Sequence, residues 1–159
     1  MRFLLVDRIL EMESGKRAVG IKNVTLSEDF LTYHFPEMPI MPGMLIAEAL
    51  VQLSDWLVRE TTDFQAMGIA TAFERMRFRH LVRPGDQLRL EVEILSRTET
   101  EAAVKGKAFC EGTSVATVDF TLGLQPIDPY LTSDEARRLY RLILAPARRG
   151  NDGSSEHGQ

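Results

Sequence analysis

The chain has 159 residues, of which 44% are hydrophobic and 26% charged, as expected for one globular domain with a sizeable core. Its net charge of −4 argues against a nucleic-acid partner. The single cysteine, Cys110, excludes an intramolecular disulfide, and no apolar stretch reaches the length of a membrane span, so we expect a cytoplasmic protein.

The first 33 residues contain one clear strand pattern. The apolar positions of residues 1–12 fit either a short helix or a covering segment. Residues 17–25 alternate, with Val19 and Ile21 on one face, which predicts a strand. Residues 27–29 favour a short helical turn before the next loop.

A proline-rich loop followed by an apolar helix forms the centre of the sequence. Pro36, Pro39 and Pro42 exclude a helix before Pro42, which itself suits the first helical position. From there to about Arg59 the residues predict a helix, and its first turns are apolar on every side. Such a helix is normally buried, so we expect it to form the core.

Two ionisable side chains stand out in this stretch. His34 lies in the loop, and Glu48 is the only ionisable residue between Pro42 and Leu53. Because a buried, unpaired carboxylate is costly, we expect Glu48 to hold a proton near neutral pH and to form an acid–base pair with an imidazole. The alternative is a structural glutamate bonded to nearby backbone, with His34 merely closing the loop.

From Gln65 onward the hydrophobic period changes to two. Four strands are expected, at residues 68–81, 87–96, 102–111 and 114–124, and short polar turns join the last three as hairpins. One helix followed by antiparallel strands is an α+β pattern. The simplest way to bury this helix is to wrap the antiparallel sheet around it. An antiparallel sheet around one long central helix is the hot-dog fold.

The C-terminal part has a different character. A Thr-Ser-Asp-Glu sequence at residues 132–135 is a capping box, which predicts a helix from about Ser133 to Leu144. The residues that follow are polar and cannot bury apolar area. We therefore divide the chain into a hot-dog domain (1–130), a C-terminal helix extension (131–146) and a disordered tail (147–159).

The segment from His34 to Gln52 resembles a known active-site motif. It reads His-Phe-Pro-x-x-Pro-Ile-Met-Pro-Gly-x-Leu-x-x-Glu-Ala-x-x-Gln, and it is similar to that of the (3R)-hydroxyacyl-[acyl carrier protein] dehydratases of the FabZ type. Residues 3–10 and 77–88 are similar to the same family. The resemblance implies dehydration of (3R)-hydroxyacyl thioesters to trans-2-enoyl thioesters, in fatty acid or related lipid or polyketide synthesis.

The resemblance also implies partners and roles. The acyl chain would arrive on the phosphopantetheine arm of acyl carrier protein, at a site shared by a homodimer or a trimer of dimers. His34 would take the C2 proton, Glu48 would protonate the departing hydroxide, and the Gly43 N–H at the helix start would stabilise the thioester oxygen. Neither a metal nor another cofactor is needed. The remaining expected substrate-binding residues are Tyr33, Pro42, Met44 and Gln52.

Three details leave alternatives open. Gln52 lies one turn beyond Glu48, where it could bond to the carboxyl, to a site water, or at the dimer interface. Arg75, Arg77 and Arg79 share one strand face, which is either a docking surface for the acidic carrier or simply solvated. Tyr33 and Glu37 replace glycines usual in the family, which suggests a specialised relative.

Two other functions fit the same residues. A hot-dog acyl thioesterase would use the helix carboxylate to act on water, usually without the His-Phe-Pro loop. A non-catalytic acyl-binding subunit would bind acyl chains without hydrating an enoyl thioester.

Overall fold

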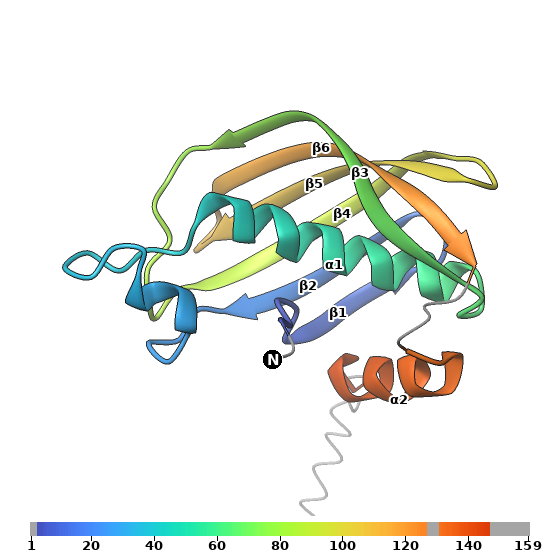
Figure 1. Cartoon of the computed structure of the whole chain (residues 1–159), viewed down its shortest axis with the longest axis horizontal. Coiled ribbons are helices and arrows are strands. Elements are labelled where there is room, and N and C mark those ends of the chain that lie inside the picture. The colour runs from blue at the N-terminus through green and yellow to red at the C-terminus, as the bar shows by residue number, and fades with distance from the viewer. Residues whose placement is uncertain (1–2, 127–130, 147–159) are drawn as a thin grey trace, which may run out of the picture.

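The computed structural model describes residues 3–126 and 131–146, and is organised around the helix α1 (Gly43–Thr61), as Figure 1 shows. The helix is buried along most of its length because its side chains are apolar around the circumference. Pro42 is the residue before the helix, not its first residue, and the helix ends two residues beyond Arg59. The fully buried side chains of α1 include Ile46, Leu50, Leu53, Leu57 and Val58.

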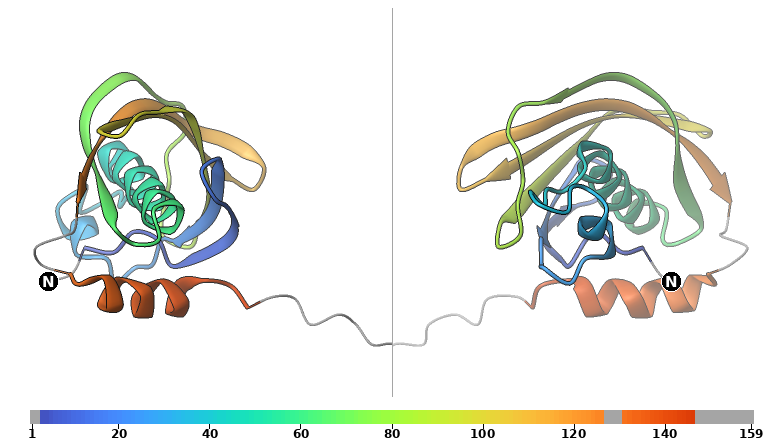
Figure 2. Two further views of the ribbon diagram at one scale, coloured as in Figure 1. Left: turned by 90° about the vertical axis from the view of Figure 1, so that its right-hand side faces the viewer. Right: turned by 60° about the vertical axis from the view of Figure 1, so that its left-hand side comes forward.

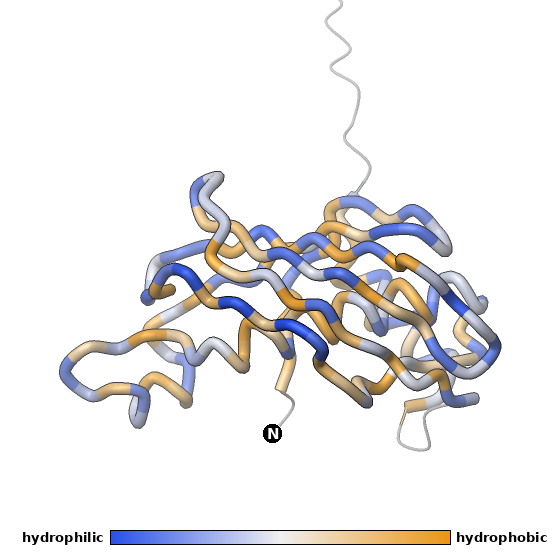
Figure 3. The backbone as a smooth tube through the Cα atoms, turned by 90° about the horizontal axis from the view of Figure 1, so that it is seen from above, coloured by the Kyte–Doolittle hydropathy of each residue, from blue (hydrophilic) through white to orange (hydrophobic). Residues whose placement is uncertain are grey.

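A six-stranded antiparallel sheet curves around α1, which confirms the α+β hot-dog fold (Figures 1 and 2). Its strands lie in the order β1-β2-β4-β5-β6-β3. Hydrophilic and hydrophobic residues alternate along them, as Figure 3 shows. The bounds are β1 (Arg8–Glu13), β2 (Arg17–Asn23), β3 (Ala66–Phe78), β4 (Gln87–Arg97), β5 (Glu101–Cys110) and β6 (Thr113–Pro126).

Two N-terminal expectations need correction. Residues 8–13, which fitted a helix or a covering segment, form the edge strand β1 on β2. The helical turn is the 3₁₀ helix η1 (Asp29–Thr32), slightly later than expected. Residues 8–13 form a strand because they pair with β2 in an antiparallel hairpin, which their own ambiguous periodicity does not indicate.

The face of β2 that meets α1 includes Ala18 and Gly20, the two smallest residues of the strand. Gly20 lies so close to the helix that a Cβ atom there would come within 3.2 Å of Leu53 Cδ1. Lys22 on the same face is only 4% exposed, and its Nζ lies 2.5 Å from Glu28 Oε1, which pairs the buried charge. The close approach of β2 to α1 therefore depends on Gly20, which lies on the face of the strand opposite that of Val19 and Ile21.

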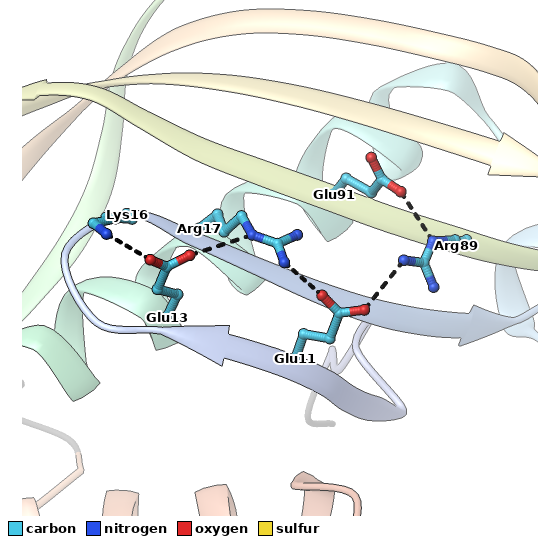
Figure 4. A network of polar contacts seen from close by, with 6 residues as sticks. All are labelled: Glu11, Glu13, Lys16, Arg17, Arg89 and Glu91. Carbon is cyan, nitrogen blue, oxygen red and sulfur yellow. Dashed lines mark hydrogen bonds and ion pairs between the residues drawn. The ribbon is translucent and has the colours of Figure 1, made fainter.

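The outer face of the sheet is charged where β1, β2 and β4 lie side by side. Figure 4 shows carboxylates and cations alternating across these strands. The Nη2 of Arg17 lies 2.8 Å from Glu11 Oε2, and the Nε of Arg89 lies 2.9 Å from Glu91 Oε1. These side chains are about half exposed, so each pair contributes little to stability but makes this a water-facing surface.

The C-terminal helix α2 (Ser133–Ile143) lies across the opening that the curved sheet leaves below α1 (Figure 2). The predicted capping box is confirmed, since Thr132 and Glu135 bond to each other's backbone N–H groups. Tyr140 packs between Trp56 and Phe64, with ring centroids 6.0 Å and 5.4 Å away. The predicted tail and the boundary at residue 130 lie outside the described residues.

The other edge of the sheet, β3, has apolar side chains that the chain leaves uncovered. Phe73, Met76 and Phe78 pair in register with Phe120, Val118 and Ala116, which are all buried. They therefore point to the inner face, yet they are 38%, 38% and 42% exposed.

Among the described residues, no helix is long and apolar enough to cross a membrane.

Candidate active site

The loop before α1 is held by its own backbone. The N–H of Phe35 donates to Met38 O and the N–H of Met38 donates back to Phe35 O, while Ile40 N–H donates to His34 O at 3.0 Å. The next residue, Met41, donates to Val82 O at 2.8 Å, which fastens the loop to the segment before β4. These bonds give His34 a defined position without regular secondary structure.

The hydrogen bond of the His34 imidazole fixes its tautomer. Its Nδ1 lies 3.2 Å from Ile40 O, and since a carbonyl oxygen only accepts, Nδ1 must carry the proton of this bond. In the neutral ring Nε2 then has the free lone pair. The half-buried ring also stacks on Phe35, with 4.5 Å between centroids.

The start of α1 offers backbone donors. The N–H groups of Leu45 and Ile46 turn back to Pro42 O, at 2.9 and 3.3 Å. Gly43 and Met44 come earlier in the helix, where amides have no intrahelical carbonyl and lie at the positive end of the dipole. A Cβ atom on Gly43 would come within 3.0 Å of the Phe78 ring, so only glycine fits there without a shift.

Glu48 lies in the second turn of α1, at the edge of a hollow of about 300 Å³. The helix residues that line the hollow follow the spacing of one face, and β3 provides the opposite wall. Glu48 itself is half-buried, so it is less sheltered than expected. The full lining is Glu48, Val51, Gln52 and Asp55 of α1 with Gly68, Ile69 and Ala70 of β3.

Within one chain, His34 and Glu48 do not meet. Among the described residues no hydrogen bond joins them, and His34 does not line the hollow beside Glu48. Gln52, in contrast, does contact Glu48, since its Nε2 donates to Glu48 Oε1 at 3.0 Å. The first alternative given for Gln52, a hydrogen bond to the Glu48 carboxyl, is therefore present.

The other expected binding residues lie around the helix start. Pro42 is half-buried, and Met44 is 52% exposed on the first turn of α1. Tyr33 is 84% exposed. These three positions are open to another molecule, but within one chain they do not enclose a substrate.

Arg75 and Arg77 lie on the outer face at the end of β3, and Arg79 directly follows the strand. Arg75 and Arg77 pair in register with Asp119 and Thr117, and the Nη1 of Arg79 donates to Thr117 Oγ1 at 3.2 Å. All three are exposed. The prediction that they share a face agrees with this register, and Asp119 offsets part of their positive charge.

Two contributors were not expected from the sequence. Asp55 ends the hollow, where its Oδ1 accepts the Gly68 N–H at 2.7 Å. Its spacing of seven residues from Glu48 was the available signal. The second is the N-terminal backbone at Phe3 and Leu5, which bonds to Gln52 and which no local pattern indicates. No cluster of potential metal ligands occurs in the described residues.

Known proteins share sequence and fold with this chain. A FabA-like domain signature matches residues 1–119. The "3-hydroxyacyl-[acyl-carrier-protein] dehydratase FabZ" of Geobacillus thermodenitrificans is 47% identical over 127 residues, which cover 78% of this chain and 88% of that protein. That of Caldanaerobacter subterraneus is 52% identical over 107 residues, covering 67% of this chain and 76% of the relative.

A solved structure shares the fold at low sequence identity. The smu.793 protein of Streptococcus mutans, bound to acetyl CoA, superposes with a TM-score of 0.61 at 15% identity. The match covers 79% of this chain and 94% of the other. At this identity the likeness concerns only the fold.

Proposed function

Because the chain belongs to the FabA-like family, among the FabZ-type 3-hydroxyacyl-[acyl-carrier-protein] dehydratases, we propose that it dehydrates (3R)-3-hydroxyacyl thioesters carried on acyl carrier protein. The product is the trans-2-enoyl thioester, formed in fatty acid synthesis or a related lipid or polyketide pathway in the cytoplasm. The observation that carries the proposal is the His34 ring, whose Nδ1 bond to Ile40 O leaves Nε2 free as a base.

The reaction assigns one step to each group. Nε2 of His34 removes a proton from C2, and the electron pair forms the C2–C3 double bond as the C3–O bond breaks. Glu48 gives its proton to the departing hydroxide, so water leaves. The Gly43 N–H bonds to the thioester oxygen while negative charge builds there. One proton then returns from the imidazolium to the Glu48 carboxylate, which restores both groups.

The site is completed by a second copy of the chain. The separation of His34 from the Glu48 hollow, and the uncovered inner side chains of the edge strand β3, both support a homodimer. His34 of one subunit then serves with Glu48 of the other. Sedimentation should give a dimer or a trimer of dimers, and a fully active monomer would contradict this assembly.

The carrier protein docks on Arg75, Arg77 and Arg79. Acyl carrier proteins are acidic, and these exposed cations lie on the outer face at one end of β3. The opposite face of the strand end holds Phe78, which packs over Gly43 at the helix start. A carrier on this surface would therefore be close to the oxyanion donor.

The proposal is tested by hydration of crotonyl thioester, followed by loss of enoyl absorbance. Wild type should be active, and His34→Ala and Glu48→Gln should each lose about 10²- to 10⁴-fold. His80→Ala and Glu99→Gln are matched controls, because both residues are exposed and outside the site, and they should keep the full rate. Full activity in both site variants would refute the assigned roles.

Two further measurements, thiol release and acyl binding, separate the two rival functions. A thioesterase would release thiol from a saturated acyl thioester, and His34→Ala would not affect that release. An acyl-binding subunit would bind the thioester but leave the enoyl absorbance unchanged. Either result in the wild-type protein would replace the dehydratase proposal.

A further inference from the structure

The side-chain amide of Gln52 makes three hydrogen bonds that join distant parts of the chain. Its Oε1 accepts the N–H of Leu5 at 2.8 Å. Its Nε2 donates to Phe3 O at 3.0 Å and to Glu48 Oε1 at 3.0 Å. Both amide hydrogens are therefore used, one for the N-terminal segment and one for the carboxyl.

The N-terminal bonds fix which way the amide points. A backbone N–H can only donate and a backbone carbonyl can only accept, so Leu5 requires the oxygen of Gln52 and Phe3 requires its nitrogen. A flipped amide would place its NH₂ donors against the Leu5 N–H donor and its oxygen against the Phe3 O acceptor. The group facing Glu48 is consequently an N–H, and Glu48 Oε1 must accept.

The N-terminal segment is itself firmly placed. Leu5 and Val6 are 2% and 5% exposed, and the N–H of Asp7 donates to Ile21 O of β2 at 2.8 Å. Residues 3–6 therefore form a strap that the core and β2 hold against α1. Gln52 is the link between this strap and the carboxyl of Glu48.

We propose that Gln52 is a positioning residue through which the strap, residues 3–6, fixes the Glu48 carboxyl with its proton on Oε2. Because the carbonyl oxygen of a carboxylic acid accepts hydrogen bonds better than its hydroxyl oxygen, the bond from Gln52 to Oε1 favours a proton on Oε2 and opposes the rotation that exchanges the two oxygens. The inference rests on the proposed role of Glu48 as the acid. Misplacement of a catalytic group by about 1 Å can cost about 10²-fold in rate.

A double-mutant cycle tests whether Gln52 acts through Glu48. Gln52→Met keeps the length of the side chain but removes all three bonds. It should lower kcat by about 10- to 100-fold in the wild-type background, and by less than about 2-fold in the Glu48→Gln background. Equal losses in both backgrounds would mean a merely structural role and would overturn the proposal. Gln65→Met is the matched control, because Gln65 is exposed and its side-chain amide donates to Asp63 O and not to Glu48 or the strap.

A second measurement does not depend on any enzymatic activity. Hydrogen exchange at the Leu5 amide should be about 10-fold or more faster in Gln52→Met than in wild type or Gln65→Met. In Glu48→Met, the side-chain amide resonances of Gln52 should shift in the NMR spectrum. If wild type has no dehydratase activity but both changes occur in the variants, the proposed reaction is wrong and the coupling of the strap to Glu48 through Gln52 still holds. Unchanged exchange and unchanged resonances would refute the coupling itself.

Discussion

Replacing Gly43 by proline should remove one N–H donor from the site and leave the fold intact. Gly43 is the first residue of α1, the position where proline is best tolerated, because its N–H has no intrahelical partner. The residue before it, Pro42, has φ −57 and ψ 136, and this ψ is within the range that a following proline requires. The backbone is thus already arranged for the substitution.

The expected magnitude follows from the role of the donor. Loss of one oxyanion donor typically costs about 10²- to 10³-fold in kcat, or about 2.7–4 kcal/mol of transition-state stabilisation. The free energy of unfolding should change by no more than about 1 kcal/mol, because the neighbouring Phe78 ring is 42% exposed and can move aside. Steady-state kinetics on crotonyl thioester, with thermal unfolding in parallel, measure both quantities.

Gly43→Ala is the control that separates the N–H from the added carbon. Its Cβ atom meets the same Phe78 ring at 3.0 Å, but its N–H remains. The kcat of Gly43→Pro should therefore be far below that of Gly43→Ala, and this difference should account for most of the loss relative to wild type. If both variants lose the same factor, the Cβ contact is responsible and the Gly43 N–H does not stabilise the oxyanion.

Three further results are expected. Reversing the charges of Arg75, Arg77 and Arg79 together should raise KM for a carrier-linked substrate and spare a short thioester analogue, whereas equal effects on both would count against docking. Burial, followed by the nearby negative charge of Glu60, raises the pKa of the Tyr140 phenol above 10.0, so the stability that the protonated phenol contributes should be complete below pH 10 and be lost as the pH rises through the raised pKa; phenolate absorbance and the free energy of unfolding should change over the same pH range, and phenol ionisation without any loss of stability would contradict this. Leu50→Ala should lower the free energy of unfolding by about 2–5 kcal/mol in chemical denaturation, because Leu50 is fully buried in the core, and a smaller loss would mean that the core collapses around the gap.

The sequence predicted the elements whose signals are local. The apolar residues from Met44 onward specify a buried helix in any fold that can cover them, and the prolines before it specify a loop. Period-two patterns predicted the strands β3 to β6 to within a few residues, and the capping box placed the start of α2. His34 and Glu48 stood out because each is a polar group in an apolar or constrained stretch.

What the sequence by itself determined is the set of elements and the chemistry of their side chains, since propensity, periodicity and capping act over a few residues. Only the tertiary structure decided that β3 pairs with β6 and remains an edge, that residues 8–13 form a strand, and that Gln52 bonds to the backbone of residues 3–5. The first and the third outcome depend on contacts between residues about 50 apart in the chain, whereas the strand at residues 8–13 depends on pairing with the neighbouring strand β2. Such contacts form when buried polar groups and apolar faces find partners across the whole chain, and no short stretch of sequence contains that information.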